Sequence, residues 1–272
     1  MKRLRVAGLW LIPATVIVLI AAVTMALFLD RDGDRITLRS QNNFSIGSYY
    51  AYVQPWGAQS YYIGRLWGEW ADSIGVDTET FPNRTRIDWR WPPFSPGNGV
   101  GVWGYNHLGY GNYDGGESVK QVVPKRVRDI GELRSEYAWN GNFDYGDASL
   151  LLEFYLRSDP ADSESKVIEI GWFLHVPDVT RQFVAGSKQI GTYIDPQGRK
   201  WRVAMEETFC TFSLVDGQDT RSGSVDMLHA LGWLRTRGLV KGDEWLTGVA
   251  LGAEPVSGVG HVEIERWKVT WK

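Results

Sequence analysis

The sequence of 272 residues contains a single cysteine, Cys210, so the chain cannot form an intrachain disulfide bond. A domain built from this sequence must therefore be stabilised by packing, and the length is sufficient for one large domain with a substantial core. Cys210 lies in the apolar and β-branched stretch ETFCTFSLV. That setting indicates a small buried hydrophobic residue rather than a nucleophile.

The sequence also lacks an excess of charge of either sign. Its 29 Lys and Arg residues against 32 Asp and Glu residues give a net charge of −3. No basic face is implied, so no nucleic-acid partner is predicted. Internal repeats and low-complexity tracts are missing as well. The segment DRDGD at residues 30–34 loosely resembles a calcium loop, but the full spacing of ligands is absent, so no metal site is predicted.

The N-terminal segment is the clearest local signal in the chain. The first five residues carry three cations, and an uncharged run then extends from Val6 to Leu29. A bilayer core requires about 20 apolar residues of helix, whereas the apolar region of a secretory signal has about 7–15. We therefore expect residues 1–29 to be a membrane anchor with the basic end in the cytoplasm and the remainder outside. Cleavage after Ala21 or Ala22, which would give a secreted protein, is the alternative.

Beyond the anchor, the sequence predicts a polar linker at residues 30–43 and one domain at residues 44–272. Short stretches of alternating polarity, separated by Gly, Pro, Asn and Asp, are typical of a β-sandwich or barrel. One helix is predicted over residues 224–237, with Ser224 capping its start and Gly238 ending it. Fourteen Trp, twelve Tyr and ten Phe favour a carbohydrate ligand, because aromatic rings stack on sugar rings.

Two predicted strands each carry a glutamate opposite an apolar face. In LLLEFYL, alternate side chains form an apolar face and Glu153 lies on the other one; in KVIEIGWFLH, Glu169 is placed in the same way. Its expected companions on that face are Gly171, Phe173 and His175. A carboxylate among apolar neighbours must be paired or must shift its pKa, and glycosidases use two such groups as nucleophile and acid. A solvated sheet face is the alternative.

A third glutamate, Glu254, follows small residues at every second position from Gly248 onward. Small neighbours on the same face would leave room for a sugar ring, although the segment is also compatible with a plain turn. The adjacent residues Glu206 and Glu207 point to opposite faces of a strand. We expect solvent exposure for at least one of them and no catalytic role.

The segments EIGWFL and GAEPVSG resemble the two catalytic motifs of glycoside hydrolase family 12, E-[LIM]-M-I-W-L and G-[TF]-E-P-x-x-G. The resemblance implies that Glu169 is the nucleophile and Glu254 the acid/base. LLLEFYL resembles the family strand in which an Asp hydrogen-bonds the nucleophile. Glu153 takes the place of that Asp and is the third predicted catalytic residue.

Two further segments extend this resemblance. YVQPWG resembles the family pattern N-x-W-G, which places Trp56 at the sugar-stacking position and Gln54 where Asn is usual. VWGYNHLGYG resembles V-x-S-Y-P-x-x-x-x-G, which places Tyr105 on the family tyrosine and Asn106 where Pro is usual. The resemblance implies substrate binding by Gln54, Trp56, Tyr105 and Phe173. Gly171 and Phe173 replace a family Met and Trp, so we expect a wider cleft floor.

The resemblance implies an all-β fold, a β-jelly roll of two curved antiparallel sheets with one packed helix and an open cleft. It implies a retaining, endo-acting hydrolase that cleaves β-1,4-linked glucan by double displacement and needs no cofactor. We expect a monomer, although nothing in the sequence fixes the oligomeric state. Cellulose-like, mixed-linkage and xyloglucan substrates remain open. Two alternatives are a carbohydrate-binding protein on the same fold with impaired catalysis, and a structural envelope protein whose aromatic residues serve only as core.

Overall fold

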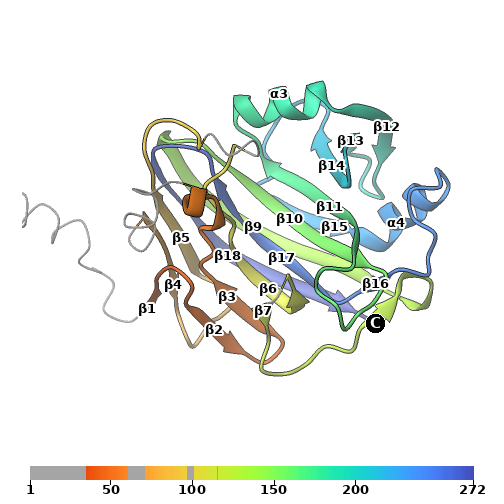
Figure 1. The fold of residues 1–272 in the computed structure, drawn as a ribbon, viewed down its shortest axis with the longest axis horizontal. Helices are drawn as coiled ribbons and strands as arrows, with labels where there is room; N and C mark the ends of the chain where they lie inside the picture. Colours follow the sequence, from red (N-terminus) through yellow and green to blue (C-terminus); the bar gives the residue numbers. More distant parts are fainter. Residues whose placement is uncertain (1–34, 61–70, 97–100, 115) are drawn as a thin grey trace, which may run out of the picture. The chain divides into compact units, whose positions relative to one another are not determined.

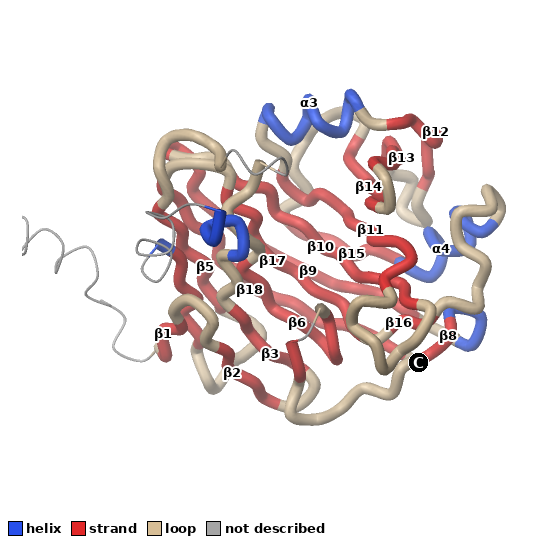
Figure 2. Tube along the Cα trace, in the orientation of Figure 1, coloured by secondary structure: helices blue, strands red, loops and turns tan. Residues whose placement is uncertain are grey.

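The computed structural model of the chain describes residues 35–60, 71–96, 101–114 and 116–272. Strands predominate in this part, and helical segments are few and short (Figure 2). The expected membrane anchor at residues 1–29 lies outside the described residues and stays a prediction. In the described part of the chain, no helix has both the length and the apolar character that crossing a membrane requires.

The smaller of two β-sheets has six strands, each antiparallel to its neighbours. Its order is β1 (Ile36–Leu38), β4 (Asp72–Val76), β5 (Thr85–Arg90), β18 (Val259–Trp271), β9 (Leu133–Tyr145) and β15 (Ser222–Asp226). Buried and more exposed residues alternate along β4 and β5, as expected for strands with one face against a core.

Strand β1 lies within the segment that was expected to be a linker. Leu38 pairs with Ile74 of β4 and is buried. The folded domain therefore begins at Ile36, before the expected boundary at residue 44. The reason is local: the short sequence ITL alternates in polarity and adds an edge strand to the sheet.

Among the described residues the larger sheet has twelve strands, most of which are labelled in Figure 1. Its main path is β12 (Lys188–Ile194), β13 (Lys200–Glu206), β14 (Phe209–Leu214), β11 (Lys166–His175), β10 (Ala148–Arg157), β17 (Gly248–Pro255), β6 (Asn106–Tyr113), β3 (Tyr49–Tyr52) and β2 (Asn43–Ile46). The short strands β16 (Trp245–Leu246) and β8 (Lys125–Arg126) extend it beside β10, and β7 (Gly116–Glu117) pairs with β6.

The expectation of purely antiparallel sheets is wrong at one place, where β11 and β14 pair in parallel. Parallel neighbours need a crossover connection. Here the crossover consists of helix α3 (Asp178–Gly186) followed by β12 and β13. The sequence analysis did not predict α3, and its N-cap residue, Pro177, offers no side-chain cap that would have signalled a helix start.

The predicted helix at residues 224–237 exists but begins later. Helix α4 spans Met227–Arg235, and its N-cap is Asp226, whose carboxylate accepts a hydrogen bond from the His229 backbone N–H at 3.0 Å. Ser224, the expected cap, instead belongs to β15 and pairs with Glu136 of β9. Pairing with β9 therefore extends the strand through the residues expected to form the first helical turn. Two 3-10 turns, η1 (Trp56–Ser60) and η2 (Val127–Asp129), complete the described elements.

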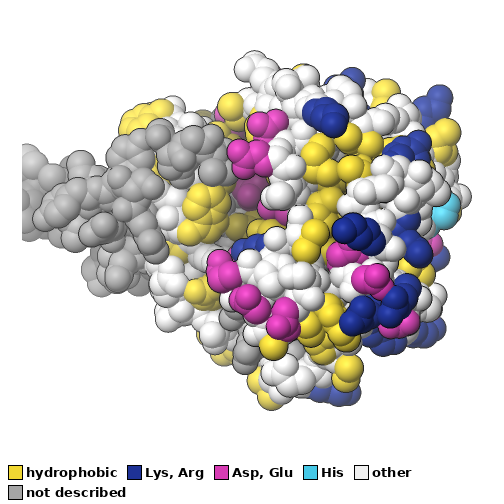
Figure 3. Space-filling model, turned by 45° about the vertical axis from the view of Figure 1, so that its right-hand side comes forward, with side chains coloured by type: hydrophobic (Ala, Val, Ile, Leu, Met, Phe, Trp, Pro, Cys, Tyr) yellow, Lys and Arg dark blue, Asp and Glu magenta, His cyan; other side chains and the backbone are white. Residues whose placement is uncertain are grey.

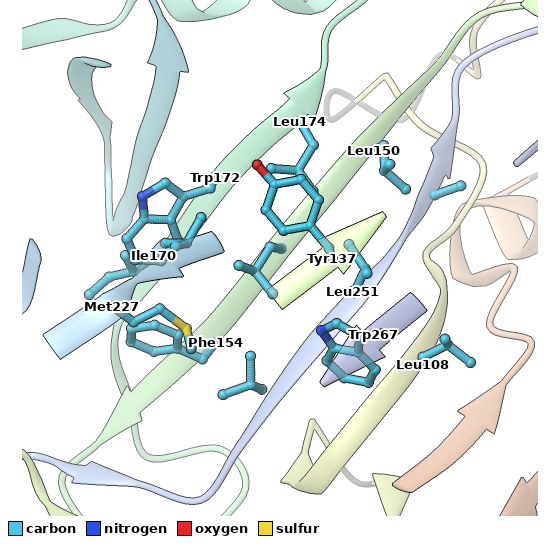
Figure 4. Close-up of a cluster of buried hydrophobic side chains, with 14 of the residues drawn as sticks. Leu108, Tyr137, Leu150, Phe154, Ile170, Trp172, Leu174, Met227, Leu251 and Trp267 are labelled. Carbon is cyan, nitrogen blue, oxygen red and sulfur yellow. The ribbon is translucent and has the colours of Figure 1, made fainter. Parts of the chain in front are cut away.

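The core lies between the two sheets and contains the apolar faces predicted for LLLEFYL and KVIEIGWFLH. Figure 4 shows Leu150 and Phe154 of β10 beside Ile170, Trp172 and Leu174 of β11. The Trp172 ring stacks on Phe212 with 4.7 Å between ring centroids. Cys210 is also fully buried, as predicted, and burial raises the pKa of its thiol to about 12.

Candidate active site

The opposite face of the larger sheet is hollowed into a cleft of about 740 Å³. Figure 3 shows acidic side chains lining a hollow in the molecular surface. The cleft residues include all seven side chains that the sequence analysis selected: Gln54, Trp56, Tyr105, Glu153, Glu169, Phe173 and Glu254. The structure therefore brings together residues from β17, β11, β10 and the segments around β3 and β6.

The strand register explains how the glutamates come to surround one space. Glu153 of β10 lies opposite Gly171 of β11 on one side and Ala250 of β17 on the other. Glu169 is displaced from this level toward one end of the strands, and Glu254 toward the other end. Because both also line the cleft, the three carboxyl groups surround one space, with Glu153 between the other two along the strand direction.

Glu153 is almost completely buried, with 2% of its surface exposed. The Tyr113 hydroxyl donates a hydrogen bond to its Oε1 atom, whereas Oε2 is buried without a hydrogen-bond donor. The Glu153 and Glu169 carboxyl groups lie within hydrogen-bonding reach of each other. Two carboxylates can only accept, so this contact is a hydrogen bond only when one of them carries a proton.

Burial and then the neighbouring charges of Glu169 and Glu254 raise the pKa of Glu153 well above its usual range. Burial also raises the pKa of Glu169, but the hydrogen bond with Glu153 and the positive charge of Lys166 oppose that shift. We therefore place the shared proton on Glu153, which donates it to an ionised Glu169.

Glu254, unlike Glu169, is expected to carry a proton near neutral pH. Part of its side chain is accessible from the cleft, yet the surrounding protein desolvates the carboxyl group. Desolvation, followed by the charge of Glu169, raises the pKa of Glu254 to about 8. With the shared proton on Glu153 and a second proton on Glu254, the site holds one ionised carboxylate, Glu169, and two protonated carboxyl groups. An ionised carboxylate and a protonated carboxyl group in one cleft are what acid-assisted nucleophilic displacement requires.

A layer of aromatic residues that the sequence analysis missed supports the carboxyl groups. Tyr113, which donates to Glu153, stacks on Tyr155 with ring centroids 5.3 Å apart. Tyr50 donates to the Tyr113 carbonyl at 2.8 Å. Tyr155 lies two residues after Glu153 on β10, so strand alternation places both on one face, but nothing in the sequence linked β6 to Glu153.

Two of the predicted substrate-binding residues are largely enclosed. Tyr105 is 3% exposed, stacks on His107, and donates its hydroxyl hydrogen bond to the Leu151 carbonyl at 3.0 Å. Phe173 is also 3% exposed. Both residues shape the cleft wall, whereas Trp56 is only partly buried and presents more surface to a ligand.

The expected wider floor at Gly171 is wrong. A Cβ atom at Gly171 would lie 2.9 Å from Leu151 Cδ1 and 3.0 Å from Phe209 Cε2. The space that a larger side chain would occupy is therefore already filled from the neighbouring strands. Phe209 of β14 belongs to the cleft lining, and only the tertiary pairing of β14 with β11 reveals its role.

The room expected beside Glu254 is also filled by protein. A Cβ atom at Gly252 would lie 2.4 Å from the Asn106 carbonyl oxygen and 2.5 Å from His107 Cβ. Ala250 is fully buried as well. The small residues of β17 therefore serve the close approach of β6 rather than a sugar ring.

His175 does not lie on the strand face that alternation predicted, and Glu206 and Glu207 both border the cleft. A β-bulge where β11 meets Leu150 and Leu151 turns His175 out of the cleft face, and its ring stacks on Phe143 of the other sheet at 3.9 Å. Glu206 and Glu207 are exposed, as expected for at least one of them, but both line the cleft. They flank the turn between β13 and β14, where strand alternation does not apply.

Gln54 is held by a buried polar group behind the cleft. The Gln54 backbone N–H donates to Asn106 Oδ1 at 3.1 Å. Asn106 lies beside the buried Asp72, which accepts a hydrogen bond from Trp91 Nε1 at 2.8 Å. Among the described residues, no cluster of His, Cys, Asp and Glu side chains is arranged to hold a metal ion.

Comparison with known proteins bears on the fold. No family model matches the sequence, and neither does any curated protein. Among solved structures, the chain is similar to endoglucanase 3 of Trichoderma harzianum from family GH12, with 18% identity, a TM-score of 0.66, and coverage of 89% of this chain and 100% of that one. It is similar to a family 12 xyloglucanase from Bacillus licheniformis, with 16% identity, a TM-score of 0.70, and coverage of 87% and 100%.

A metagenome-derived family 12 endoglucanase is also similar, with 17% identity, a TM-score of 0.70, and coverage of 89% of this chain and 99% of that one. The fold of this chain is therefore the β-jelly roll of family 12 glycoside hydrolases, which confirms the fold that the resemblance implied. Almost the whole length of each relative is matched.

Proposed function

We propose that this chain is a retaining, endo-acting glycoside hydrolase that cleaves β-1,4-linked glucan. The observation that carries the proposal is one cleft lined by Glu169 of β11, Glu153 of β10 and Glu254 of β17. The similar solved structures are named as endoglucanases and xyloglucanases, which supports a β-glucan substrate. An open cleft suits attack within a polymer chain.

In the proposed reaction, a Glu169 oxygen attacks the anomeric carbon while Glu254 donates its proton to the glycosidic oxygen. The C–O bond to the leaving sugar breaks and a covalent glycosyl-enzyme forms. Glu254, now ionised, removes a proton from water, which attacks the same carbon and releases Glu169. Glu153 keeps Glu169 ionised by donating a hydrogen bond to it, and no external cofactor is needed.

Release of reducing ends from soluble β-glucans tests this proposal. We expect wild-type protein lacking the first 35 residues to hydrolyse at least one of cellulose-derived, mixed-linkage or xyloglucan substrates, with the β-anomer formed first in NMR spectra. Glu169→Gln should abolish turnover of every substrate. An α-anomer as first product would exclude double displacement, and full activity of Glu169→Gln would end the assignment.

Glucan binding without cleavage by the wild-type domain would instead favour the alternative of a carbohydrate-binding protein. This alternative is supported by Glu153, because the family 12 motif that LLLEFYL resembles has Asp at this position. Affinity electrophoresis in gels containing each glucan distinguishes the two functions, because it detects binding without requiring turnover.

A further inference from the structure

Helix α3 contributes to the same cleft as the three glutamates. Val179, Thr180 and Phe183 line the cavity together with Glu169 and Glu254. The helix follows β11 directly and leads into β12 at the edge of the larger sheet (Figure 1). Helix α3, which connects two strands, therefore also forms part of the cleft wall.

The position of α3 is fixed by contacts to both neighbouring segments. The Thr180 and Ser149 hydroxyls are 3.0 Å apart, and Ser149 is the register partner of Glu254. Arg181 Nη1 donates to the Gly217 carbonyl at 2.8 Å, and Val184 is buried against the domain. The distance from α3 to Glu254 is therefore set by the fold.

Despite this anchoring, α3 leaves two apolar side chains accessible. Val179 is 45% exposed and Phe183 is 43% exposed. Residues four apart lie on one face of a helix, and both of these border the cleft. Covering an apolar surface beside a substrate cleft with an apolar ligand face is energetically favourable. The C–H face of a pyranose is an apolar ligand face of this kind.

The order of strands places α3 at one end of the cleft. Trp56 follows β3, which lies on one side of the catalytic strands β17, β10 and β11. Helix α3 joins β11 to β12, and the turn carrying Glu206 and Glu207 joins β13 to β14, so both are connected to strands on the other side. If Trp56 stacks on a sugar on the non-reducing side of the cleaved bond, α3 lies on the side of the leaving sugar.

Charge further restricts the ligand at this end. Glu206 and Glu207 are exposed, and among the described lining residues the cleft contains no Lys or Arg. Exposed carboxylates accept hydrogen bonds from sugar hydroxyls but repel uronate groups. The ligand that fits is a neutral sugar unit with one apolar face toward α3.

We propose that α3 forms the leaving-group subsite of the cleft, in which Phe183, supported by Val179, packs against the neutral sugar unit released in the first step. This inference rests on the proposed hydrolase function. The same subsite binds an acceptor sugar when the glycosyl-enzyme reacts with a sugar hydroxyl instead of water.

The test compares two substrates of the soluble domain that differ only in the leaving group. A β-cellooligosaccharide places a sugar against α3, whereas a β-cellobiosyl fluoride releases fluoride, which is too small to reach the helix. We expect Phe183→Ala to lower kcat/KM about tenfold on the oligosaccharide and to leave kcat/KM on the cellobiosyl fluoride unchanged. It should also lower the ratio of transfer to hydrolysis when cellobiose is added as acceptor.

Gln182→Ala is the matched control, because Gln182 is exposed on the same helix and is absent from the cleft lining. Phe183→Trp should retain the oligosaccharide rate, and thermal unfolding should show that each variant is folded. Equal losses on both substrates, or no loss on the oligosaccharide, overturn the role of α3 while the hydrolase function stands. If wild-type protein turns over neither substrate, both proposals fail.

Discussion

The hydroxyl of Tyr113 donates a hydrogen bond to Glu153, so a residue of β6 orients a carboxyl group of β10 across the buried floor of the cleft. Glu153 in turn reaches Glu169 of β11. The chain from Tyr113 through Glu153 to Glu169 links β6 to the proposed nucleophile. The step from Glu153 to Glu169 depends on the proton that Glu153 retains, whereas the Tyr113 hydroxyl can donate to Glu153 in either protonation state.

Removing the proton donor beside Glu169 should change the pH dependence of hydrolysis. Glu153→Leu cannot donate, so the pKa of Glu169 should rise and the acidic limb of the kcat/KM profile should move to higher pH. Glu153→Gln keeps an N–H donor and should retain more activity than Glu153→Leu. Coincident acidic limbs in wild type and Glu153→Leu would contradict the proton assignment.

Tyr113→Phe tests the same chain from its other end. Loss of the hydroxyl leaves both Glu153 oxygens without a donor, and an unsatisfied buried polar group costs about 1–3 kcal/mol of stability. We expect a lower melting temperature together with an upward shift of the acidic limb. A variant that is destabilised but has an unchanged pH profile would limit Tyr113 to a structural role.

Glu254 should determine the basic limb of the pH profile. Burial raises its pKa to about 8, so activity on natural glucans should fall as the pH rises past that value and the proton is lost. Glu254→Gln should remove this limb and lower glucan hydrolysis by several orders of magnitude. Glycosyl-enzyme formation from an activated fluoride, which needs little protonation, should persist, as a burst of fluoride release would show.

Because the space beside Gly171 is filled, adding a single methyl group at this position should lower the stability of the domain. Gly171→Ala should be destabilised by about 1–3 kcal/mol, because its Cβ atom would contact Leu151 and Phe209 at or near 3 Å. Trimming the obstacle in the double variant with Phe209→Leu should recover part of the loss in chemical denaturation. Additive effects of the two substitutions would argue against the contact.

Asp72 makes the stability of the domain depend on pH. Burial raises its pKa to about 7, so between roughly pH 4 and 7 the folded state binds a proton that the unfolded state has lost. The free energy of unfolding should therefore decrease as the pH rises through this range, by at most roughly 4 kcal/mol from this group.

Asp72→Asn isolates that contribution, because it retains an acceptor for Trp91 and cannot ionise. Relative to wild type, the variant should gain stability as the pH rises from 4 to 8 in urea denaturation. A constant difference between the two proteins over that range would show that Asp72 titrates normally. Glu153 and Glu254, whose pKa values are also raised, should leave a residual dependence in the variant.

Strand periodicity was sufficient to determine which faces of β10 and β11 enter the core, because alternation depends only on local backbone geometry. The motifs around Glu169 and Glu254 likewise identified two glutamates that line one cleft. The regular positions Leu150, Phe154 and Trp172 all lie where alternation placed them.

Tertiary structure alone decided the features that alternation does not describe. A bulge at the end of β11 turned His175 to the other sheet, and the turn at Glu207 brought adjacent acids to one rim. Phe209 filled the space above Gly171, and Tyr113 reached Glu153, because strands distant in sequence lie close together in the sheet. These contacts depend on register and packing between strands, which a pattern within one strand does not contain.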